Sequence, residues 1–273
     1  MSERHLPGTL DYHVHTNFSC DSKTTMVTAC DMAVLRGIDE IVFTDHADFE
    51  PLDECTGYLR ADAYMAEIRR CQFAYGDDLI IRAGVEVGEG HLYPDAVADL
   101  LAAYEFDFVL GSLHWVHGRP AFNGRYFKDQ GLEKGLRAYF EDLACLVAGA
   151  DFDVLAHFDI VRRAIYRVYG LRTLDYTSFE ETIRRVLRTL VERGKGLEIN
   201  TSNSHRGMGD PNPTPQVLRW YREEGGEILT VGSDAHVPDA VGLDYDRALD
   251  MARAAGFTRL ARFEKRQVSW IEI

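Results

Sequence analysis

The sequence predicts an α/β protein folded as a TIM-like barrel of about seven β/α units. Short apolar runs of strand length alternate with segments of helical spacing along the whole chain, without a linker, repeat or low-complexity stretch. This alternation is typical of parallel strands joined by helices in one domain, which we expect to cover residues 1–273. An open doubly wound sheet is the alternative, but no G-x-G-x-x-G turn follows the first strand.

The first predicted strand carries the first chemical signal, because it ends in two histidines separated by one residue. The segment Thr9-Leu10-Asp11-Tyr12-His13-Val14-His15 alternates as an extended chain does. Side chains of a strand alternate between its faces, so His13 and His15 point the same way, with Asp11 behind them. Two imidazoles on one face suit a zinc, manganese or iron ion, although an isolated H-x-H pair is just as often structural.

The remaining elements follow in order, with helices where apolar residues recur every three or four positions. Gly37 and Gly76 are plausible helix ends, and Pro51 and Gly57 mark a loop over 50–60. Helices are predicted over 26–37, 61–75, 95–104, 132–148, 179–193, 216–224 and 245–255. Strands are predicted over 41–43, 79–86, 106–113, 152–156, 196–199, 227–231, 260–263 and 268–273, with long connections over 115–131 and 201–215.

Most of these strands end in a residue that can bind a metal. The residues at the strand ends are His13 and His15, His46, Glu86, His114, His157, Asn200, and Asp234 with His236. One such ending would carry little weight, but in a barrel all of these ends meet on one rim. The sequence therefore predicts a metal cluster at the carboxyl ends of the strands.

Composition limits the partners and the compartment. A chain of 273 residues with 46% hydrophobic residues can bury a core, and a net charge of −14 disfavours a nucleic-acid partner. We find no signal peptide and no apolar run of about 20 residues, so no membrane partner is expected. The five cysteines are scattered and never in C-x-x-C spacing, which predicts reduced thiols in a cytoplasmic protein. The sequence leaves open whether the protein is a monomer or a homo-oligomer.

The strand-end motifs resemble those of the PHP (polymerase and histidinol phosphatase) superfamily. The motifs are D-x-H-x-H at Asp11, T-D-H at Thr44, Glu86, S-x-H at Ser112, H-x-D at His157 and S-D-A-H at Ser233. The resemblance implies a (β/α)7 barrel of the PHP type with three divalent transition metals (Zn, Mn or Fe). Ala156-His157-Phe158-Asp159 and Glu198-Ile199-Asn200-Thr201-Ser202 are similar to the single-domain histidinol-phosphate phosphatases within that superfamily.

The resemblance also implies a set of metal ligands. One metal position would use His13, His15, Glu86 and Asp234; a second would share Glu86 and add His114 and His157. A third would take Asp21, where some members have histidine, together with His46 and His236. Glu86, Asp234 and His236 are accordingly expected to serve catalysis as well. Cys20 is expected to be a packed bystander, and Asp11 and Asp45 are expected to orient imidazoles from behind.

Residues that could contact a phosphorylated substrate follow the same strand ends. Arginine matches phosphate oxygens, and the candidates are Arg162, Arg163, His117, His205 and Arg206. An amine on the substrate would need carboxylates and aromatic surface. Two loops offer them at Asp48, Phe49, Glu50, Asp53 and Glu54, and at Trp115, Phe122 and Tyr126.

The resulting hypothesis is a metal-dependent phosphomonoesterase. By resemblance, its substrate is L-histidinol phosphate, hydrolysed to L-histidinol and phosphate in histidine biosynthesis by a hydroxide that the metals generate. A PHP phosphoesterase acting on another small ester, a nucleotide or nucleic acid is the alternative. An amidohydrolase is less consistent, because the bridging lysine common on its fourth strand is missing, and a non-catalytic metal-binding protein is a further alternative.

Overall fold

A computed structural model describes residues 8–273 of the protein, and it confirms the predicted barrel. The barrel strands are β1 (Leu10–Val14), β2 (Glu40–Phe43), β4 (Ile80–Gly88), β5 (Phe108–Ser112), β8 (Val154–Leu155), β9 (Gly196–Asn200) and β10 (Leu229–Gly232). They are parallel and neighbour one another in chain order. Between the first and last strands, His15 donates its backbone N–H to Ala235, and Asp234 donates to His13, at 2.9 and 2.7 Å. The sheet is therefore nearly closed into a barrel of 7 strands.

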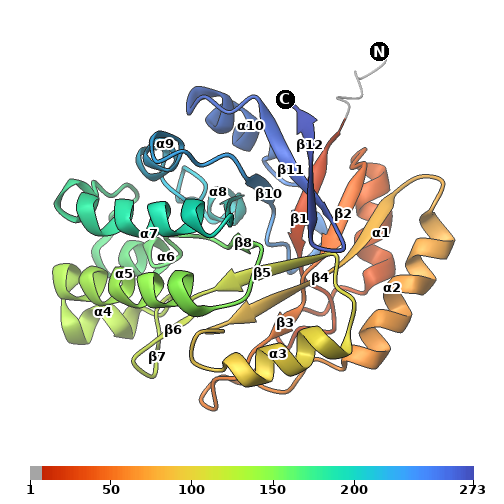
Figure 1. The fold of residues 1–273 in the computed structure, drawn as a ribbon, viewed down its shortest axis with the longest axis horizontal. Helices are drawn as coiled ribbons and strands as arrows, with labels where there is room; N and C mark the ends of the chain where they lie inside the picture. The colour runs from red at the N-terminus through yellow and green to blue at the C-terminus, as the bar shows by residue number, and fades with distance from the viewer. Residues whose placement is uncertain (1–7) are drawn as a thin grey trace.

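Helices surround the sheet, as Figure 1 shows. They are α1 (Met26–Leu35), α2 (Ala61–Tyr75), α3 (Pro94–Ala103), α5 (Leu132–Gly149), α7 (Glu180–Glu192), α9 (Pro215–Glu223) and α10 (Tyr245–Ala254). In α7 the buried residues Ile183, Val186, Leu187 and Leu190 recur at the spacing of one helix face. This apolar stripe is what attaches the helix to the barrel, and the same pattern made the helices predictable from the sequence.

Several short elements between the strands were not predicted. The connection over 115–131 contains the hairpin strands β6 (Trp115–Val116) and β7 (Arg119–Pro120) and the helix α4 (Gly124–Gln130). After β8 the chain forms α6 (Arg162–Tyr169), and after β9 it forms α8 (Ser202–His205). The two-residue strand β3 (His46–Ala47) pairs with β4, and 3-10 turns occupy Thr177–Phe179 and Pro238–Ala240. These elements are too short or too polar to show a hydrophobic period, yet most of them lie at the rim that carries the site.

The hairpin of β11 (Arg259–Glu264) and β12 (Gln267–Glu272) contacts the amino ends of the barrel strands. Phe263 donates its backbone N–H to the hydroxyl of Tyr12, and its ring lies 5.0 Å from that of Phe108. Arg266 pairs with Asp153, just before β8. The hairpin thus covers the end of the barrel opposite to the site.

No helix among residues 8–273 has the length and apolarity that crossing a membrane requires. The expected cytoplasmic location remains a prediction.

The expectation of uniformly reduced cysteines is wrong, because Cys20 and Cys55 form a disulfide. Their sequence separation is 35 residues, and both lie in irregular loops, so neither spacing nor periodicity indicated the pairing. Of the other cysteines, Cys30 and Cys71 are buried and free, and Cys145 is exposed and free.

Candidate active site

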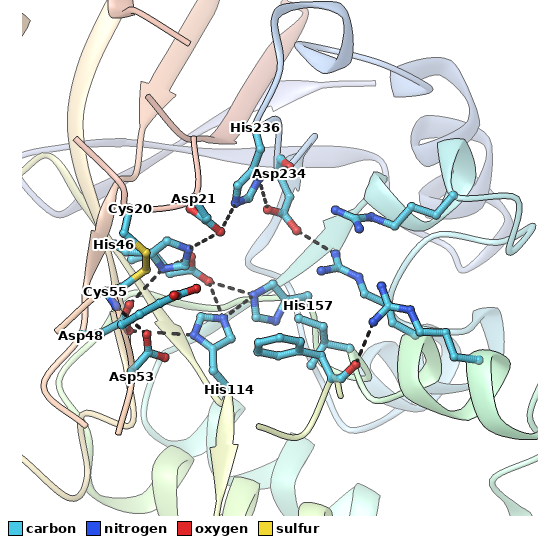
Figure 2. A pocket seen from close by; sticks show the side chains of 17 residues that line it. Cys20, Asp21, His46, Asp48, Asp53, Cys55, His114, His157, Asp234 and His236 are labelled. Atoms are coloured by element: carbon cyan, nitrogen blue, oxygen red, sulfur yellow. Dashed lines mark hydrogen bonds and ion pairs between the residues drawn. A yellow bond between two sulfur atoms is a disulfide. The ribbon is translucent and has the colours of Figure 1, made fainter. Parts of the chain in front are cut away.

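The predicted metal-binding side chains converge at the carboxyl ends of the strands, at the bottom of a pocket of about 410 Å³ (Figure 2). Each barrel strand ends at this rim, so residues far apart in sequence become neighbours. His46 begins β3, shortly after β2, and lies opposite Glu86 of β4 in the register of the sheet. His114 and His157 follow β5 and β8, and Asp234 and His236 follow β10.

Glu86 lies at the centre of the cluster. Its carboxylate is buried, with 1% of the residue exposed, and five imidazole nitrogens surround it. The distances are 2.8 Å to His157, 3.2 Å to His46 and 3.4 Å each to His13, His15 and His114. Burial alone would raise the pKa of Glu86, but the neighbouring imidazoles, His13 foremost, outweigh burial and hold this pKa well below its usual value. The carboxylate is therefore ionised and able to bridge cations.

The remaining predicted ligands form two groups beside Glu86. Asp234 Oδ1 lies 3.5 Å from Nε2 of His15 and 3.8 Å from Nε2 of His13. Asp21 Oδ2 lies 2.9 Å from Nε2 of His236 and 3.7 Å from Nε2 of His46. Thus all of the side chains assigned to metals from the sequence lie in one cluster, Asp21 included.

The donor atoms suit divalent cations. Nε2 of His13 and Nε2 of His15 face each other at 2.9 Å, and Nε2 of His114 and Nε2 of His157 do so at 3.3 Å. Burial first, and then the neighbouring imidazoles of His236 and His46, lower the pKa of His15 to about 3, so this ring is neutral and offers a lone pair. At His13 and His114 the neighbouring carboxylates outweigh burial and raise the pKa well above its usual value, so these rings would release a proton when a metal binds. Imidazoles together with carboxylates are a donor set of transition metals such as zinc.

The two candidate imidazoles at the end of β1, His13 and His15, are each held through the second ring nitrogen. His13 donates from Nδ1 to Oε1 of Glu198 at 2.6 Å, and both residues are fully buried. Nδ1 of His15 lies 3.0 Å from Oγ of Ser19, which donates to Asp45 at 2.7 Å. Asp45 therefore acts on His15 through a serine. Metal-binding histidines commonly have such outer partners, which orient the ring.

Asp11 does not orient an imidazole, contrary to the expectation. Its carboxylate accepts from the backbone and hydroxyl of Ser233, at 2.8 and 2.6 Å, and from the backbone of Gly242. It fixes the turn that carries Asp234. The carboxylate that does orient an imidazole, Glu198, was seen only as part of a family motif, because its partner His13 is 185 residues away in sequence.

We expect Glu198→Gln to weaken metal binding through His13. The amide would exchange a charged acceptor for a neutral one, and losing such an outer partner typically costs about 10- to 100-fold in metal affinity. Metal affinity measured by chelator competition should show this fall. Glu227→Gln, which alters an exposed carboxylate paired with Arg259 before β10, is the control that should retain wild-type affinity. Equal affinities in both variants would contradict the role assigned to Glu198.

Gly232 is needed at the end of β10 because His13 and Glu198 meet there. A Cβ atom at this position would lie 2.4 Å from Oε1 of Glu198 and 2.4 Å from Cβ of His13. Real side chains do not approach so closely, so a larger residue would separate the imidazole from its carboxylate.

The two adjacent arginines have different environments, and the prediction for Arg162 is wrong. Arg162 is 1% exposed; it donates to the backbone carbonyl of Pro211 at 2.7 Å and lies 3.9 Å from Asp159. It is a structural residue away from the pocket. Arg163 does line the pocket and donates from Nη2 to Asp234 at 2.8 Å and also to Ser202.

Arg206, as predicted, lines the pocket, together with Arg167, which the sequence reading missed. We call Arg163, Arg167 and Arg206 the arginine wall. The positive charge of Arg163 is the first cause, before burial, that lowers the pKa of Arg206. Three cations so close together form a region that favours an anion.

Of the two predicted histidine contacts, the one at His117 is wrong and the one at His205 stays a prediction. His117 is exposed, in the turn of the β6–β7 hairpin, and does not line the pocket. The backbone of His205 ends α8, but its side chain lies outside what the structure describes.

On another side of the pocket lie Asp48, Asp53 and Glu54, which we call the acidic wall. Figure 2 shows Asp48 and Asp53 across the cluster from the guanidinium groups. Of the other residues expected there, Phe122 lines the pocket, and Trp115 donates its indole N–H to Asp53. Glu50 and Tyr126 do not line it: Glu50 accepts from the hydroxyl of Tyr93, and Tyr126 is buried and donates to Gly135.

A nearly closed parallel barrel with histidines and carboxylates clustered at its strand ends is typical of barrel proteins that bind divalent metals at this rim. The model of one such family, the PHP domain, matches residues 11–202. The chain belongs to the PHP domain family, as its strand-end motifs predicted.

Individual proteins extend the similarity to nearly the full chain. A probable histidinol-phosphatase of Clostridium acetobutylicum is 31% identical, over 95% of this chain and 98% of that protein. The histidinol-phosphatase of Lactococcus lactis is also 31% identical, over 93% and 94% of the two chains. The crystal structure of histidinol phosphate phosphatase from Lactococcus lactis, complexed with zinc, L-histidinol and phosphate, matches with a TM-score of 0.87. The match covers 96% of this chain and 98% of that one at 26% identity.

Proposed function

We propose that the protein is a metal-dependent phosphomonoesterase that hydrolyses L-histidinol phosphate to L-histidinol and phosphate. The observation that carries the proposal is the position of the arginine wall against the metal-binding cluster, where Arg163 contacts the candidate ligand Asp234 at 2.8 Å. A phosphate ester needs cations on several oxygens at once. Support for the substrate comes from the full-length histidinol-phosphatase relatives and from the Lactococcus lactis structure with L-histidinol and phosphate.

The ligand roles in this proposal follow the three groups of the cluster. His13, His15, Glu86 and Asp234 would hold one metal, and Glu86, His114 and His157 a second. Asp21, His46 and His236 would hold a third. We assign zinc, manganese or iron to these positions on the basis of the mixed imidazole and carboxylate donors, and we take residues 1–273 as one catalytic domain.

In this mechanism the metals, when bound, acidify a water molecule and neutralise phosphoryl charge. The side chains supply orientation. The guanidinium of Arg163 is fixed by Asp234, Ser202 and Asn203, so it would hold one phosphoryl oxygen in a defined direction. Arg206 and Arg167 add positive charge at the pocket mouth and would draw the dianion toward the cluster. Glu86 keeps the surrounding imidazoles in place.

The test is metal analysis combined with a phosphate-release assay. We expect about three transition-metal ions per chain, loss of activity on chelation and recovery on adding zinc, manganese or iron. For L-histidinol phosphate, kcat/KM should exceed that for glycerol phosphate by ~100-fold, equivalent to about 2.7 kcal/mol. A protein without bound metal and without metal activation would refute the proposal. Equal activity on both esters, or a preference for a nucleotide or diester, would indicate a PHP phosphoesterase of another specificity.

A further inference from the structure

The pocket is lined by positive side chains on one side and by negative side chains on another. We relate this separation of charge to the alcohol that leaves when the phosphate ester is hydrolysed. In Figure 2 the guanidinium groups of the pocket lie on one side of the cluster, and Asp48 and Asp53 lie on another. A phosphate monoester needs only the cluster and the cations. Phosphate binding by itself does not account for Asp53 and Glu54, because carboxylates that hold no cation repel the dianion.

The acidic wall includes a carboxylate whose charge is not neutralised by the protein. Glu54 is exposed, lines the pocket, and has no hydrogen bond or ion pair with any of residues 8–273. Its neighbour Asp53 is held rigidly: one oxygen accepts from the indole of Trp115 and the other from the backbone N–H of Cys55 at 2.8 Å. Asp48 lies deeper, 3.4 Å from Nδ1 of His46 and 3.9 Å from Nδ1 of His114. These three side chains are close enough together to hold a metal ion, so Asp48 is not offered to the substrate.

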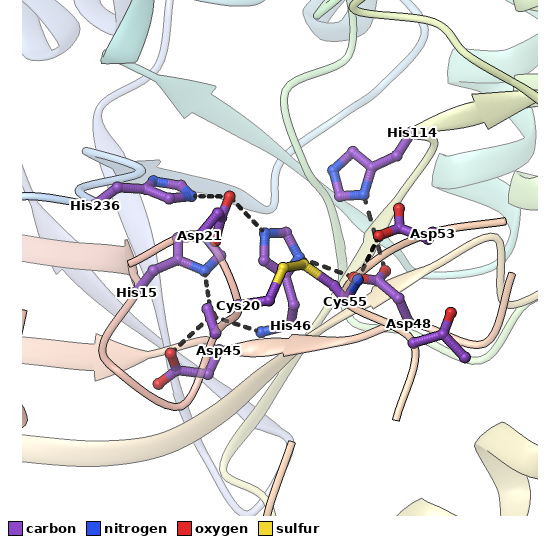
Figure 3. Close-up of a disulfide and its surroundings, with 12 residues drawn as sticks. His15, Cys20, Asp21, Asp45, His46, Asp48, Asp53, Cys55, His114 and His236 are labelled. Carbon is purple, nitrogen blue, oxygen red and sulfur yellow. Dashed lines mark hydrogen bonds and ion pairs between the residues drawn. A yellow bond between two sulfur atoms is a disulfide. The ribbon is translucent and has the colours of Figure 1, made fainter. Parts of the chain in front are cut away.

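The Cys20–Cys55 disulfide holds this wall at the rim (Figure 3). Cys55 directly follows Glu54, and Cys20 directly precedes Asp21, a candidate metal ligand that contacts His46 and His236. The chain over 51–60 has no helix or strand and only single-turn backbone hydrogen bonds, such as that from Thr56 to Asp53 at 3.2 Å. The disulfide is therefore a covalent tie between the loop that carries the acids and the metal rim.

We infer that Asp53 and Glu54 bind the ammonium group of a cationic leaving alcohol, and that the Cys20–Cys55 disulfide positions them to do so. The inference rests on the proposed function and adds the residues that set its specificity. A substrate with phosphate at one end and ammonium at the other matches the two walls in one orientation only. In the reverse orientation each charged end would meet a like charge, which is how an electrostatically divided site excludes a wrong pose.

Two esters that differ only in the amine test the inference. They are L-histidinol phosphate and its deamino analogue, 3-(imidazol-4-yl)propyl phosphate, assayed with the metal-loaded full chain. The measured quantity is kcat/KM for L-histidinol phosphate divided by kcat/KM for the deamino analogue, called the amine-dependent ratio below. Removing a charged hydrogen-bond partner of the ammonium should lower this ratio about tenfold in Glu54→Gln, and Asp53→Asn should lower it too.

The matched control is Glu50→Gln, which removes a carboxylate from the same loop outside the pocket and should keep the wild-type ratio. If Glu54→Gln and Asp53→Asn change both esters equally, or neither, the inference is overturned while the phosphatase activity stands. If the fully metallated wild-type enzyme hydrolyses neither ester, the proposed function itself fails.

The disulfide is tested in the double variant Cys20→Ser/Cys55→Ser, with Cys145→Ser, an exposed free cysteine, as the control. We expect the double variant to lower the amine-dependent ratio in the same direction as Glu54→Gln, and the control to keep it. A double variant with a lower Tm but the wild-type ratio would show that the disulfide only stabilises the fold, and would overturn its positioning role.

Discussion

Glu86→Gln is expected to abolish most activity and to lower metal content at the same time. The carboxylate lies within 3.4 Å of five imidazoles, and an amide of the same shape cannot supply the negative charge that a bridging position needs. Loss of an outer partner already costs about 10- to 100-fold, so loss of a shared ligand should reduce kcat/KM by at least ~100-fold. Elemental analysis and steady-state kinetics on the same sample measure both effects.

The control for this variant is Glu40→Gln. Glu40 is also a fully buried carboxylate on a barrel strand, but it binds Tyr12 and Arg262 at the opposite end of the barrel. We expect Glu40→Gln to lower Tm and to keep metal content. A Glu86→Gln enzyme with full metal content and wild-type turnover would show that the bridge between metals lies elsewhere.

The convergence of the histidines and carboxylates was predictable from the sequence because it follows from backbone topology. In a parallel barrel the residue after each strand reaches the same rim, so His46, Glu86, His114 and His157 needed no knowledge of side-chain contacts. Their strands were visible as apolar runs bounded by polar residues. Even Asp21, in an irregular turn, could be assigned once the resemblance gave it a role, and the structure places it 2.9 Å from His236.

Contacts between side chains far apart in sequence were not predictable in the same way. The partners of Glu198, Asp53 and Cys55 are set by how distant segments pack, and no periodic pattern encodes this. Asp11 illustrates the limit: it lies on the predicted face of β1, yet its carboxylate binds the backbone at Ser233 and Gly242 rather than an imidazole. A buried carboxylate needs several donors, and here the backbone of a turn supplied them.

Arg162 and Arg163 show that following a strand is not enough to predict that a side chain reaches the pocket. Both begin α6, and consecutive residues of a helix point about 100° apart. One side chain therefore faces the protein interior while the next faces the pocket. The sequence placed both arginines at the active rim because α6 itself, short and rich in arginine, was not predicted.

The last prediction separates these two arginines. Arg162→Ala should mainly destabilise the fold, because it leaves the carbonyl of Pro211 and the carboxylate of Asp159 without a cation inside the protein. Breaking such a buried pair costs about 3–5 kcal/mol, and each kcal/mol lowers Tm by roughly 2–4 °C in a chain of this size, so Tm should fall by about 10 °C.

Arg163→Ala should instead reduce catalysis with little change in Tm, since Arg163 lines the pocket and its main partners, Asp234 and Ser202, belong to the site. Loss of a charged contact to phosphate costs on the order of 1.5–3 kcal/mol, or about ten- to a hundredfold in kcat/KM. Calorimetry and steady-state kinetics on both variants, at full metal content, measure Tm and kcat/KM and so test both predictions. Each variant removes one guanidinium group, and the two positions are adjacent, so each variant is the control for the other. Unaltered kcat/KM in Arg163→Ala would remove Arg163 from phosphate binding, and an unaltered Tm in Arg162→Ala would show that Pro211 and Asp159 do not depend on its charge.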